Sequence, residues 1–358
     1  MVIVAASRCG QLSSASERTV SKAIQSYAAL AAQQALQPYA FELGEMRPDE
    51  VEVQVQHCGL CHSDLSVLDG EWGPPKYPVV AGHEVVGVVV AVGAQALGLK
   101  LGQQVGVGWF SRSCMICQAC TAGDYHLCES NESTILGRHG GFAERVRCHW
   151  RWATPLPEGL APAAAGPLFC GGITVFSPLI EFNVRPLDRV AVVGIGGLGH
   201  LALQFLRAWG CEVTAFTSSA NKAEEAKRLG AHYAVSSTQP AALKALRGSF
   251  DLVLVTVNVP LDWSAYVAAL KPRGRLHFVG AVTDPIAVPA FALLGGQKSI
   301  SGSPLGRPAS ITQMLDFCVR HKIAAQTEVF ALSEINQALA HLRDGKARYR
   351  IVLHNDLS

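Results

Sequence analysis

Four cysteines stand close together between residues 114 and 128: Cys114, Cys117, Cys120 and Cys128, spaced C-x2-C-x2-C-x7-C. Thiolates packed this closely would repel one another or oxidise unless a cation neutralised them, and tetrahedral zinc is the usual cation. A ferredoxin-type cluster normally carries a different spacing with a trailing proline, and a nucleic-acid module would carry a basic flanking helix. Because four thiolates leave no coordination position open, we predict a structural zinc ion here.

A second candidate is the glycine-rich stretch "GIGGLG". It follows the apolar segment "RVAVV" and opens an apolar helical segment, which is the setting in which backbone N–H groups and a helix N-terminus receive a pyrophosphate. An ordinary tight turn between a strand and a helix is the alternative. We therefore predict a dinucleotide site at Gly194, Gly196, Gly197, Leu198 and Gly199.

The end of the next strand indicates which dinucleotide is bound. NAD sites place an acid there, about 20 residues after the glycines, to hold the ribose 2′-hydroxyl. Here the sequence reads "FTSSANK", and the nearest preceding acid, Glu212, lies at the start of the strand. Ser218 and Ser219, with Lys222 nearby, offer donors and a positive charge to a 2′-phosphate. The sequence favours NADP(H), with an N-cap and loop as the alternative reading.

A third set of reactive residues is dispersed along the chain: Cys61 in "GLCHSD", His83 and Glu84 in "AGHE", and Cys170 in "LFCGG". Each is flanked by glycine and is expected at the end of a strand. Taken singly, Cys61 is more often a small buried apolar residue, and His83 is more often a core histidine. Their joint occurrence is what points to chemistry.

The elements that must position these residues fall into two parts. From about 24 to 155, short β-rich runs such as "VEVQVQ" and "VVGVVVAVG" are interrupted by glycine and proline, which predicts a compact β unit. From about 172 to 300, apolar strands such as "CEVTAF" and "DLVLVTV" alternate with helical segments, which predicts βαβ units and a parallel sheet. The fold class is therefore α/β.

Composition narrows the function further. A chain of 358 residues with 49% hydrophobic content can form two domains, and a formal net charge of +2 without basic clusters gives no footprint for nucleic acid or a membrane surface. No apolar run approaches the roughly 18 residues of a membrane span. The 11 cysteines are odd in number and clustered, which fits a reducing compartment, so we expect a cytoplasmic protein that acts on small molecules.

Together these motifs resemble the medium-chain zinc alcohol dehydrogenases. The resemblance covers about 24 to 358 and includes "GLCHSDL", "AGHEVVGVV", the four-cysteine loop, "GPLFCGGITVF", "GIGGLGH" and "DGKARYR". It is greatest to the cinnamyl-alcohol-dehydrogenase-like branch and to bacterial NADPH-dependent aldehyde reductases of broad specificity. It implies an N-terminal extension over 1–23, a GroES-like β-rich catalytic domain over 24–171 completed by 306–358, a Rossmann doubly wound parallel-sheet NADP-binding domain over 172–305, and a homodimer.

The resemblance also implies roles for the dispersed residues. Cys61, His83 and Cys170 would bind a catalytic zinc, and Glu84 would approach the metal and exchange with its fourth ligand. Three-ligand zinc keeps an open position and acts as a Lewis acid on a carbonyl oxygen. Two neighbours of the first cysteine have further implied roles: Asp64 would orient the ring of His83, and Ser63 would pass a proton to the substrate oxygen.

Further positions match family contacts to the cofactor and the substrate. Many relatives end the proton relay with a histidine five residues after the first zinc cysteine, and here that residue is Ser66. The route beyond Ser63 is therefore left open. The implied contacts are His62 and Arg350 with the pyrophosphate, Thr174 with the nicotinamide, the backbone of Val279 and Ser303 with its carboxamide, and Trp72 and Trp109 as an apolar wall for an aldehyde.

The predicted function is reversible reduction of aldehydes to primary alcohols with NADPH, with two zinc ions in each chain. An NAD-preferring zinc alcohol or polyol dehydrogenase would more often show an acid after the second strand and a glutamate in place of Cys170. A zinc-free quinone or enoyl reductase would lack the zinc ligands. A non-enzymatic binding protein that kept the fold would be expected to have lost several ligands, and all are present.

Overall fold

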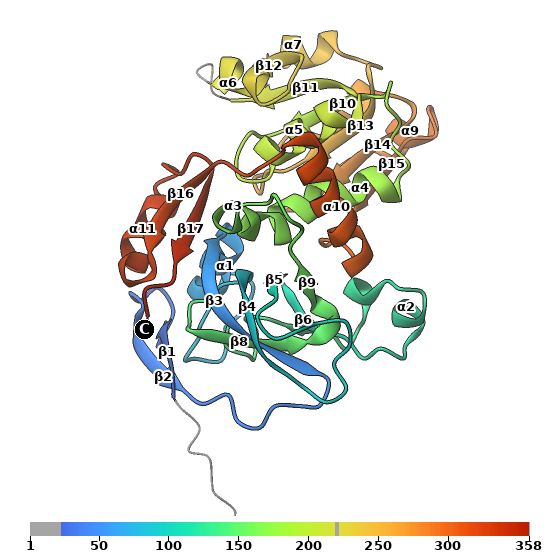
Figure 1. The fold of residues 1–358 in the computed structure, drawn as a ribbon. Coiled ribbons are helices and arrows are strands. Elements are labelled where there is room, and N and C mark those ends of the chain that lie inside the picture. Colours follow the sequence, from blue (N-terminus) through green and yellow to red (C-terminus); the bar gives the residue numbers. More distant parts are fainter. Residues whose placement is uncertain (1–22, 219–221, 358) are drawn as a thin grey trace, which may run out of the picture.

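The computed structural model describes residues 23–218 and 222–357, so the predicted extension 1–23, apart from its last residue, lies outside the described residues. Figure 1 shows two sheet-containing parts at opposite ends of the molecule, with helices between them. The predicted α/β class is confirmed. None of the helices within the described ranges is long and apolar enough to cross a membrane by itself. The consecutive segments Pro162–Phe169 and Gly171–Glu181 reach that length and apolar composition only together, and they are bent by 55° relative to each other.

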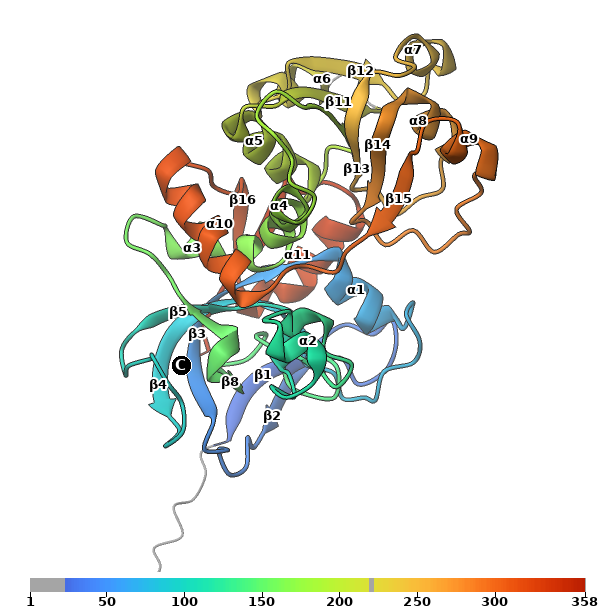
Figure 2. The ribbon, with the colours of Figure 1, turned by 90° about the vertical axis from the view of Figure 1, so that its right-hand side faces the viewer.

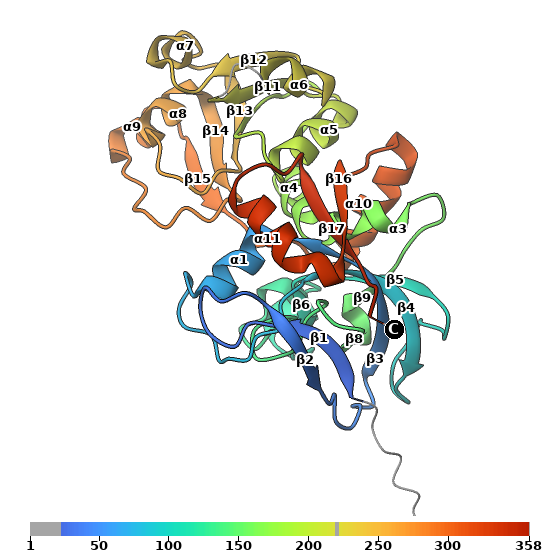
Figure 3. The ribbon, with the colours of Figure 1, turned by 90° about the vertical axis from the view of Figure 1, so that its left-hand side faces the viewer.

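The first part is built on a seven-stranded sheet in the order β16-β17-β3-β4-β5-β9, with β8 also paired to β3. Figure 3 shows the last strands of the chain, in red, beside the blue strand β3. Strand β17 pairs antiparallel with β3, so the C-terminal segment belongs to this sheet. Its strands are β3 (Glu50–Leu60), β4 (Glu84–Val92), β5 (Gln104–Val107), β8 (Arg145–His149), β9 (Ala153–Pro155), β16 (Thr327–Ala331) and β17 (Arg350–His354).

Smaller elements surround this sheet. Two two-stranded sheets pair β1 with β2 and β6 with β7. Short helices connect the strands, and α1 starts directly after β3. These elements are β1 (Ile24–Ala28), β2 (Gln37–Phe41), β6 (Phe110–Arg112), β7 (Glu132–Ser133), α1 (His62–Asp69), α2 (Gln118–Thr121), α3 (Pro162–Ala165) and α11 (Ile335–Arg343).

The second part is a six-stranded sheet in the order β12-β11-β10-β13-β14-β15, in which every neighbouring pair is parallel. The strand order reverses at β10, and loops that diverge at such a point open a crevice for ligands. The strands are β10 (Arg189–Val193), β11 (Glu212–Thr217), β12 (Tyr233–Ser236), β13 (Phe250–Val255), β14 (Leu270–Phe278) and β15 (Ser299–Gly302).

Helices cover both faces of this parallel sheet, as its apolar strands require. Figure 2 shows α5 on one side of the sheet and α8 and α9 on the other. Val190 and Val192 accordingly pack in the cluster with α5, and Ala191 and Val193 pack in the cluster with α8. The helices are α5 (Gly199–Trp209), α6 (Lys222–Arg228), α7 (Pro240–Ala245), α8 (Trp263–Ala269) and α9 (Ala290–Leu294).

Two helices, α4 (Gly171–Glu181) and α10 (Pro308–His321), join the two parts. The ring of Phe176 on α4 lies 5.2 Å from Phe205 on α5 and 5.5 Å from Phe317 on α10, measured between centroids. The same apolar cluster runs from Val86 on β4 to Leu254 on β13. This shared core fixes one sheet against the other, while the boundaries at 171/172 and 305/306 stay predictions.

Candidate active site

Four side chains predicted to surround a metal meet between the two parts of the molecule. Cys61 lies between β3 and α1, His83 and Glu84 lie at the start of β4, and Cys170 precedes α4. All four are buried, and their donor atoms lie within 4.8 Å of one another. The Sγ atoms of Cys61 and Cys170 are 3.8 Å apart, and Nε2 of His83 is 3.2 Å from the second sulfur. Sulfur and imidazole donors in this arrangement fit tetrahedral zinc.

Glycines make room for this convergence. A Cβ atom on Gly59 of β3 would lie 1.9 Å from Oε2 of Glu84, so any side chain there would displace the carboxylate. Gly82 has a φ of +94°, and a Cβ on it would lie 2.6 Å from the ring of Phe142. Only glycine combines that backbone conformation with that close contact. Glycine is therefore required at these two positions because a side chain would collide with its neighbours.

The carboxylate of Asp64 ties two of the candidate ligands together. Its Oδ2 accepts a hydrogen bond from the backbone N–H of Cys61 at 2.9 Å, and its Oδ1 accepts one from the N–H of Gly82 at 2.9 Å. Oδ1 also lies 2.9 Å from Nδ1 of His83, and Asp64 is 0% exposed. Since Nδ1 is engaged with the carboxylate, Nε2 is the ring nitrogen that faces the sulfurs.

Arg350 supplies the positive charge in this buried group. Its guanidinium forms an ion pair with Oε1 of Glu84 and lies 4.0 Å from the sulfur of Cys61, whereas Oε2 of Glu84 has no hydrogen-bond partner among the described residues. Burial raises the pKa of Glu84 although Arg350 opposes the rise. The hydrogen bond with Cys170 is the largest cause that lowers the pKa of Cys61 well below its usual range, and Arg350 adds to it. The same hydrogen bond raises the pKa of Cys170, so Cys61 is the cysteine of this pair that more readily becomes a thiolate.

A cavity of about 800 Å³ opens beside these groups and is lined by both parts of the molecule. The indole of Trp109 contacts the ring of His83 edge-on at 5.0 Å and lies 6.0 Å from Trp72, which is 46% exposed. The two indoles thus form an apolar wall near the candidate metal ligands. The predicted residues that line the cavity are Cys61, His62, Ser63, Trp72, Trp109, Cys170, Thr174, Gly197, Leu198, Val279, Ser303 and Arg350.

The proton route beyond Ser63 was left open by the sequence, and the structure shows which polar residues line the cavity near it. Oγ of Ser63 lies 3.7 Å from the sulfur of Cys61. Ser66 also lines the cavity, and its hydroxyl donates a 2.7 Å hydrogen bond to the carboxylate of Glu71, another lining residue. The carboxylate of Glu71 is therefore hydrogen-bonded to Ser66, the position at which the family resemblance leads one to expect a histidine.

The predicted glycine turn forms the opposite side of the cavity. Gly194 has a φ of +93°, and a Cβ on Gly199 would lie 2.0 Å from the carbonyl oxygen of Gly194, so both positions need glycine. The hydroxyl of Thr256 donates a 2.7 Å hydrogen bond to the same oxygen. A Cβ on Gly197 would lie 2.8 Å from Nη1 of Arg350, which brings the C-terminal strand against the turn.

The region predicted to select the cofactor lies beyond the turn. Ser218 is exposed and directly follows β11, and Nζ of Lys222 at the start of α6 donates to the carbonyl of Ile195 at 3.3 Å. Burial lowers the pKa of Lys222, and the charge of Arg348 lowers it further. Ser219 lies outside the described residues. Some predicted site residues do not line the cavity. They are Gly194, Gly196, Gly199, Ser218 and Lys222 on the cofactor side and Asp64, His83 and Glu84 around the candidate metal ligands.

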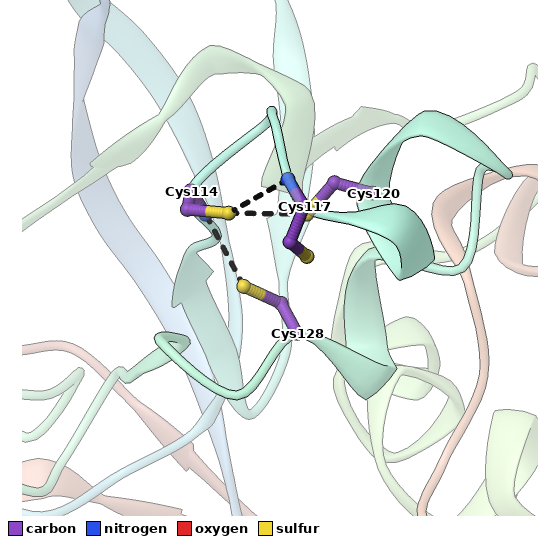
Figure 4. Close-up of side chains that lie close together, drawn as sticks. All are labelled: Cys114, Cys117, Cys120 and Cys128. Atoms are coloured by element: carbon purple, nitrogen blue, oxygen red, sulfur yellow. Dashed lines mark hydrogen bonds between the residues drawn. The ribbon is translucent and has the colours of Figure 1, made fainter.

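The four cysteines of the 114–128 loop form a separate group. Figure 4 shows their sulfurs turned toward one another, and all four lie within 4.8 Å. The N–H groups of Cys117 and Cys114 donate to the sulfurs of Cys114 and Cys128, each at 3.3 Å. Hydrogen bonds from the N–H groups of Ile116 and Cys117 lower the pKa of Cys114 to about 6. A group of four sulfurs supported by backbone donors fits a closed zinc site, and two metal-binding groups are present, as predicted.

Some cavity residues were missed by the sequence reasoning. Thr256 and Asn258 follow β13 and line the cavity. The rule that ligands bind at the carboxyl ends of parallel strands predicts such positions. His126 and Tyr349 carry no comparable local signal, because the first lies in the four-cysteine loop and the second beside Arg350.

Comparison with known proteins gives a consistent result. Residues 47–158 match the alcohol dehydrogenase GroES-like domain, and residues 197–320 match the zinc-binding dehydrogenase family. The predicted GroES-like unit beside a parallel-sheet unit is thereby confirmed. Aldehyde reductase AdhA of Synechocystis is 53% identical over 330 residues, which cover 92% of this chain and 98% of that protein. NADP-dependent alcohol dehydrogenase C 1 of Mycolicibacterium smegmatis is 37% identical over 92% of this chain and 97% of that protein.

Solved structures agree with these matches. A cinnamyl alcohol dehydrogenase from Sorghum bicolor superimposes with a TM-score of 0.89 at 36% identity, covering 93% of this chain and 98% of that chain. The cinnamyl alcohol dehydrogenase of Helicobacter pylori, in complex with NADP(H), gives a TM-score of 0.85 at 26% identity over 93% of this chain and 98% of that chain.

Proposed function

The chain belongs to the medium-chain zinc-containing alcohol dehydrogenase family, in its cinnamyl-alcohol-dehydrogenase-like branch, and we propose that it reduces aldehydes reversibly to primary alcohols with NADPH. One observation carries the proposal. The buried group of Cys61, His83 and Cys170 and the turn at Gly197 lie on walls of the same cavity of about 800 Å³. A donor set for zinc therefore faces a binding site for a hydride carrier.

The candidate ligands divide into an open and a closed set. Cys61, His83 and Cys170 would hold a catalytic zinc, which would supply a Lewis acid for the carbonyl oxygen of the substrate. Oε2 of Glu84 has no partner among residues 23–218 and 222–357, so this carboxylate is able to enter the ligand set, while Arg350 keeps its other oxygen paired. The four cysteines of the 114–128 loop would hold a structural zinc and leave no ligand position open.

The remaining residues bind and orient. Ser63 lines the cavity beside Cys61, where its hydroxyl would hand a proton to the substrate oxygen. Asp64 fixes the ring of His83 through the hydrogen bond at Nδ1. We assign His62 and Arg350 to the pyrophosphate, Thr174, Val279 and Ser303 to the nicotinamide, Gly194, Gly196, Gly197, Leu198 and Gly199 to the dinucleotide turn, and Trp72 and Trp109 to the apolar part of the aldehyde.

The preference for NADPH rests on the end of β11. A 2′-phosphate carries close to two negative charges and needs donors and cations. Ser218 and Lys222 lie there, and Ser219 is the next residue in the sequence. Glu212, the acid of this strand, lies at its opposite end and pairs with Arg189 at 2.6 Å, and Glu224 on α6 pairs with Lys227 at 2.8 Å. Relatives named as NADP-dependent support the same choice.

Steady-state rates with NADPH and NADH over a panel of aliphatic and aromatic aldehydes test this function. Charge-assisted hydrogen bonds contribute about 1.5–3 kcal/mol each, or roughly a tenfold to hundredfold preference for NADPH in kcat/KM. Ser218→Asp should shrink or invert this ratio by repelling the phosphate. Ser249→Asp, which adds the same charge before β13 at the other end of the sheet, should leave the ratio unchanged. Equal use of both cofactors by the unmodified enzyme would contradict the proposal.

We also propose that the protein is a homodimer and that it is located in the cytoplasm. Strand β15 is the edge of the parallel sheet, and α9 beside it exposes Phe291 to 86% and Leu294 to 69%. A free edge next to exposed apolar side chains suits pairing with a second copy of the chain. The cysteines of the described residues are all free, which suits a reducing compartment.

A further inference from the structure

A second cavity lies in the part of the molecule that contains the parallel sheet, between the helices α7 and α8, which pack against each other (Figure 2). Its volume of about 320 Å³ falls within the range of small-molecule sites, about 300–1,000 Å³. None of the residues proposed to hold zinc, the dinucleotide or the aldehyde lines it. The proposed function therefore leaves this cavity without a ligand.

The inner wall of the cavity is apolar and belongs to the core. Leu243 on α7 and Ala265 on α8 line it, and Leu243 is buried. Tyr266, another lining residue, is 2% exposed, and its ring contacts the ring of Phe216 on β11 edge-on at 5.6 Å. A hydrocarbon group in the cavity would therefore lie against side chains that packing already holds in place.

The two helices are also joined through the backbone. The N–H of Gly248, which follows α7, donates to the carbonyl of Ala268 on α8 at 3.0 Å, and the N–H of Ser249 donates to the carbonyl of Ala269 at 2.8 Å. These bonds fix the end of α7 against the end of α8. The cavity is therefore preformed, and a ligand does not have to open it.

Positive charges surround the opening of the cavity. Lys244 on α7 and Arg247, which follows that helix, are exposed lining residues, and neither forms an ion pair with a carboxylate in residues 23–218 and 222–357. Burial lowers the pKa of Lys298, and the charge of Arg247 lowers it further, so a third cation lies near. The one carboxylate of the lining, Asp262, caps α8 by accepting from the N–H of Ala265 at 3.2 Å. Cations therefore outnumber acids at the opening.

The apolar wall also contains a hydroxyl group. The hydroxyl of Tyr266 forms no hydrogen bond with any residue that the structure describes. Burial raises the pKa of Tyr266 to about 12, and the charge of Asp262 adds to the rise. The phenol therefore keeps its proton at neutral pH and can donate a hydrogen bond to a ligand.

We propose that this cavity binds a small carboxylate with an apolar body, whose charged end lies between Lys244 and Arg247 and whose body packs on α8 beside Ala265. Apolar walls with a few charged groups at one end suit a ligand that is divided in the same way. A neutral hydrocarbon would leave the two cations without a counter-charge, and an inorganic anion would leave the apolar wall uncovered. The inference goes beyond the proposed function, because the site is separate from the catalytic cavity.

Octanoate is the probe, and hydrogen exchange read by mass spectrometry on the zinc-loaded enzyme, with and without NADPH, locates its binding. Octanoate should protect the amides of 240–247 and 261–269, and NADPH should not displace it. 1-Octanol has the same body without the charge, so it should need an about three- to tenfold higher concentration, because exposed ion pairs contribute modestly. Octylamine, which carries the opposite charge, should bind more weakly still.

Three variants test the residues of the site. Ala265→Leu fills the cavity and should abolish the protection by octanoate while aldehyde reduction keeps its unmodified rate. The double variant Lys244→Gln with Arg247→Gln should raise the octanoate concentration for half protection about three- to tenfold. Arg320→Gln, which removes an exposed cation from α10, is the matched control and should leave that concentration unchanged.

Three results would overturn the inference. Equal binding of octanoate, 1-octanol and octylamine would show a site without charge selection. Protection confined to the residues of the catalytic cavity would place the ligand there, and displacement of octanoate by NADPH would assign the second cavity to the cofactor. If Ala265→Leu lowers the melting temperature without octanoate, the double variant of the two cations decides, and unchanged binding in it would refute the site.

Discussion

Asp64→Asn changes a single oxygen in the most enclosed part of the active site. The two carboxylate oxygens of Asp64 receive three N–H groups, from the backbone of Cys61 and Gly82 and from the ring of His83, each at 2.9 Å. An asparagine side chain has one oxygen, so one of these donors must face an NH₂ group. If the oxygen takes the place of Oδ1, the unpaired donor is the N–H of Cys61.

The cost of this change follows from the bonds that it breaks. The lost hydrogen bond is charge-assisted and contributes about 1.5–3 kcal/mol, and a buried donor left without a partner costs about 1–3 kcal/mol. Asp64 is 0% exposed, so water cannot replace the lost acceptor. We expect the free energy of unfolding to fall by roughly 2.5–6 kcal/mol. Zinc retention or turnover should fall by about 10- to 100-fold, because the ring of His83 then faces a neutral amide oxygen in place of a carboxylate and the backbone of Cys61 loses its acceptor.

Urea unfolding and competition with a chelator for zinc measure these effects. Asp69→Asn is the matched control, because it lies on the same helix α1 but pairs with Arg343 at the surface. A surface pair contributes at most about 1 kcal/mol, so the control should unfold and hold zinc much like the unmodified enzyme. An Asp64→Asn variant with unmodified stability and unmodified zinc retention would refute the reasoning.

Three further predictions use other parts of the structure. Cys170→Ala should abolish aldehyde reduction with little change in melting temperature, whereas Cys117→Ala should lower the melting temperature first, and elemental analysis should find one zinc fewer in each. Phe291→Glu should convert the proposed dimer to a monomer in light scattering; a persistent dimer would place the interface elsewhere. Burial raises the pKa of Glu52, but hydrogen bonds from the two arginines of β8 bring it below 4.5. The stability lost in Glu52→Gln should therefore be greatest above pH 4.5 and vanish as the pH falls through the lowered pKa, and urea unfolding at a series of pH values measures it.

Short spacings in the sequence predicted two of the three groups of site residues, the four-cysteine loop and the glycine turn. The four cysteines of the 114–128 loop and the glycine turn are local, so the residue types and spacing already specify what the backbone can bring together. The third group is not local, because Cys61 and Cys170 are 109 residues apart. No pattern within either segment pairs them, and only the ordered resemblance of the whole chain to a family predicted that they meet.

The resemblance predicted the contact of Asp64 with His83, but the partners of other buried polar residues could not be predicted from the sequence. His277 lies inside the segment "GRLHFVG", which predicts a strand and no more. Its contact with Ser301 follows from the parallel register of β14 and β15, in which these two residues are direct partners. Arg350 was predicted as a cofactor contact, and the structure adds its ion pair with Glu84, 266 residues earlier. Strand register over such distances depends on the packing of the complete fold.

The register between β17 and β3 joins the metal group to the cofactor turn. Ile351 pairs with Leu60, which places Arg350 beside Cys61 and against Gly197. The preceding residue, Tyr349, stacks on His200 at the start of α5 with ring centroids 4.9 Å apart. A slip of one residue would turn Arg350 to the other face of the sheet and leave Glu84 buried without its counter-charge. The same strand pairing therefore sets the distance between the metal group and the cofactor turn, and a change that disturbs it should impair cofactor binding and metal retention together.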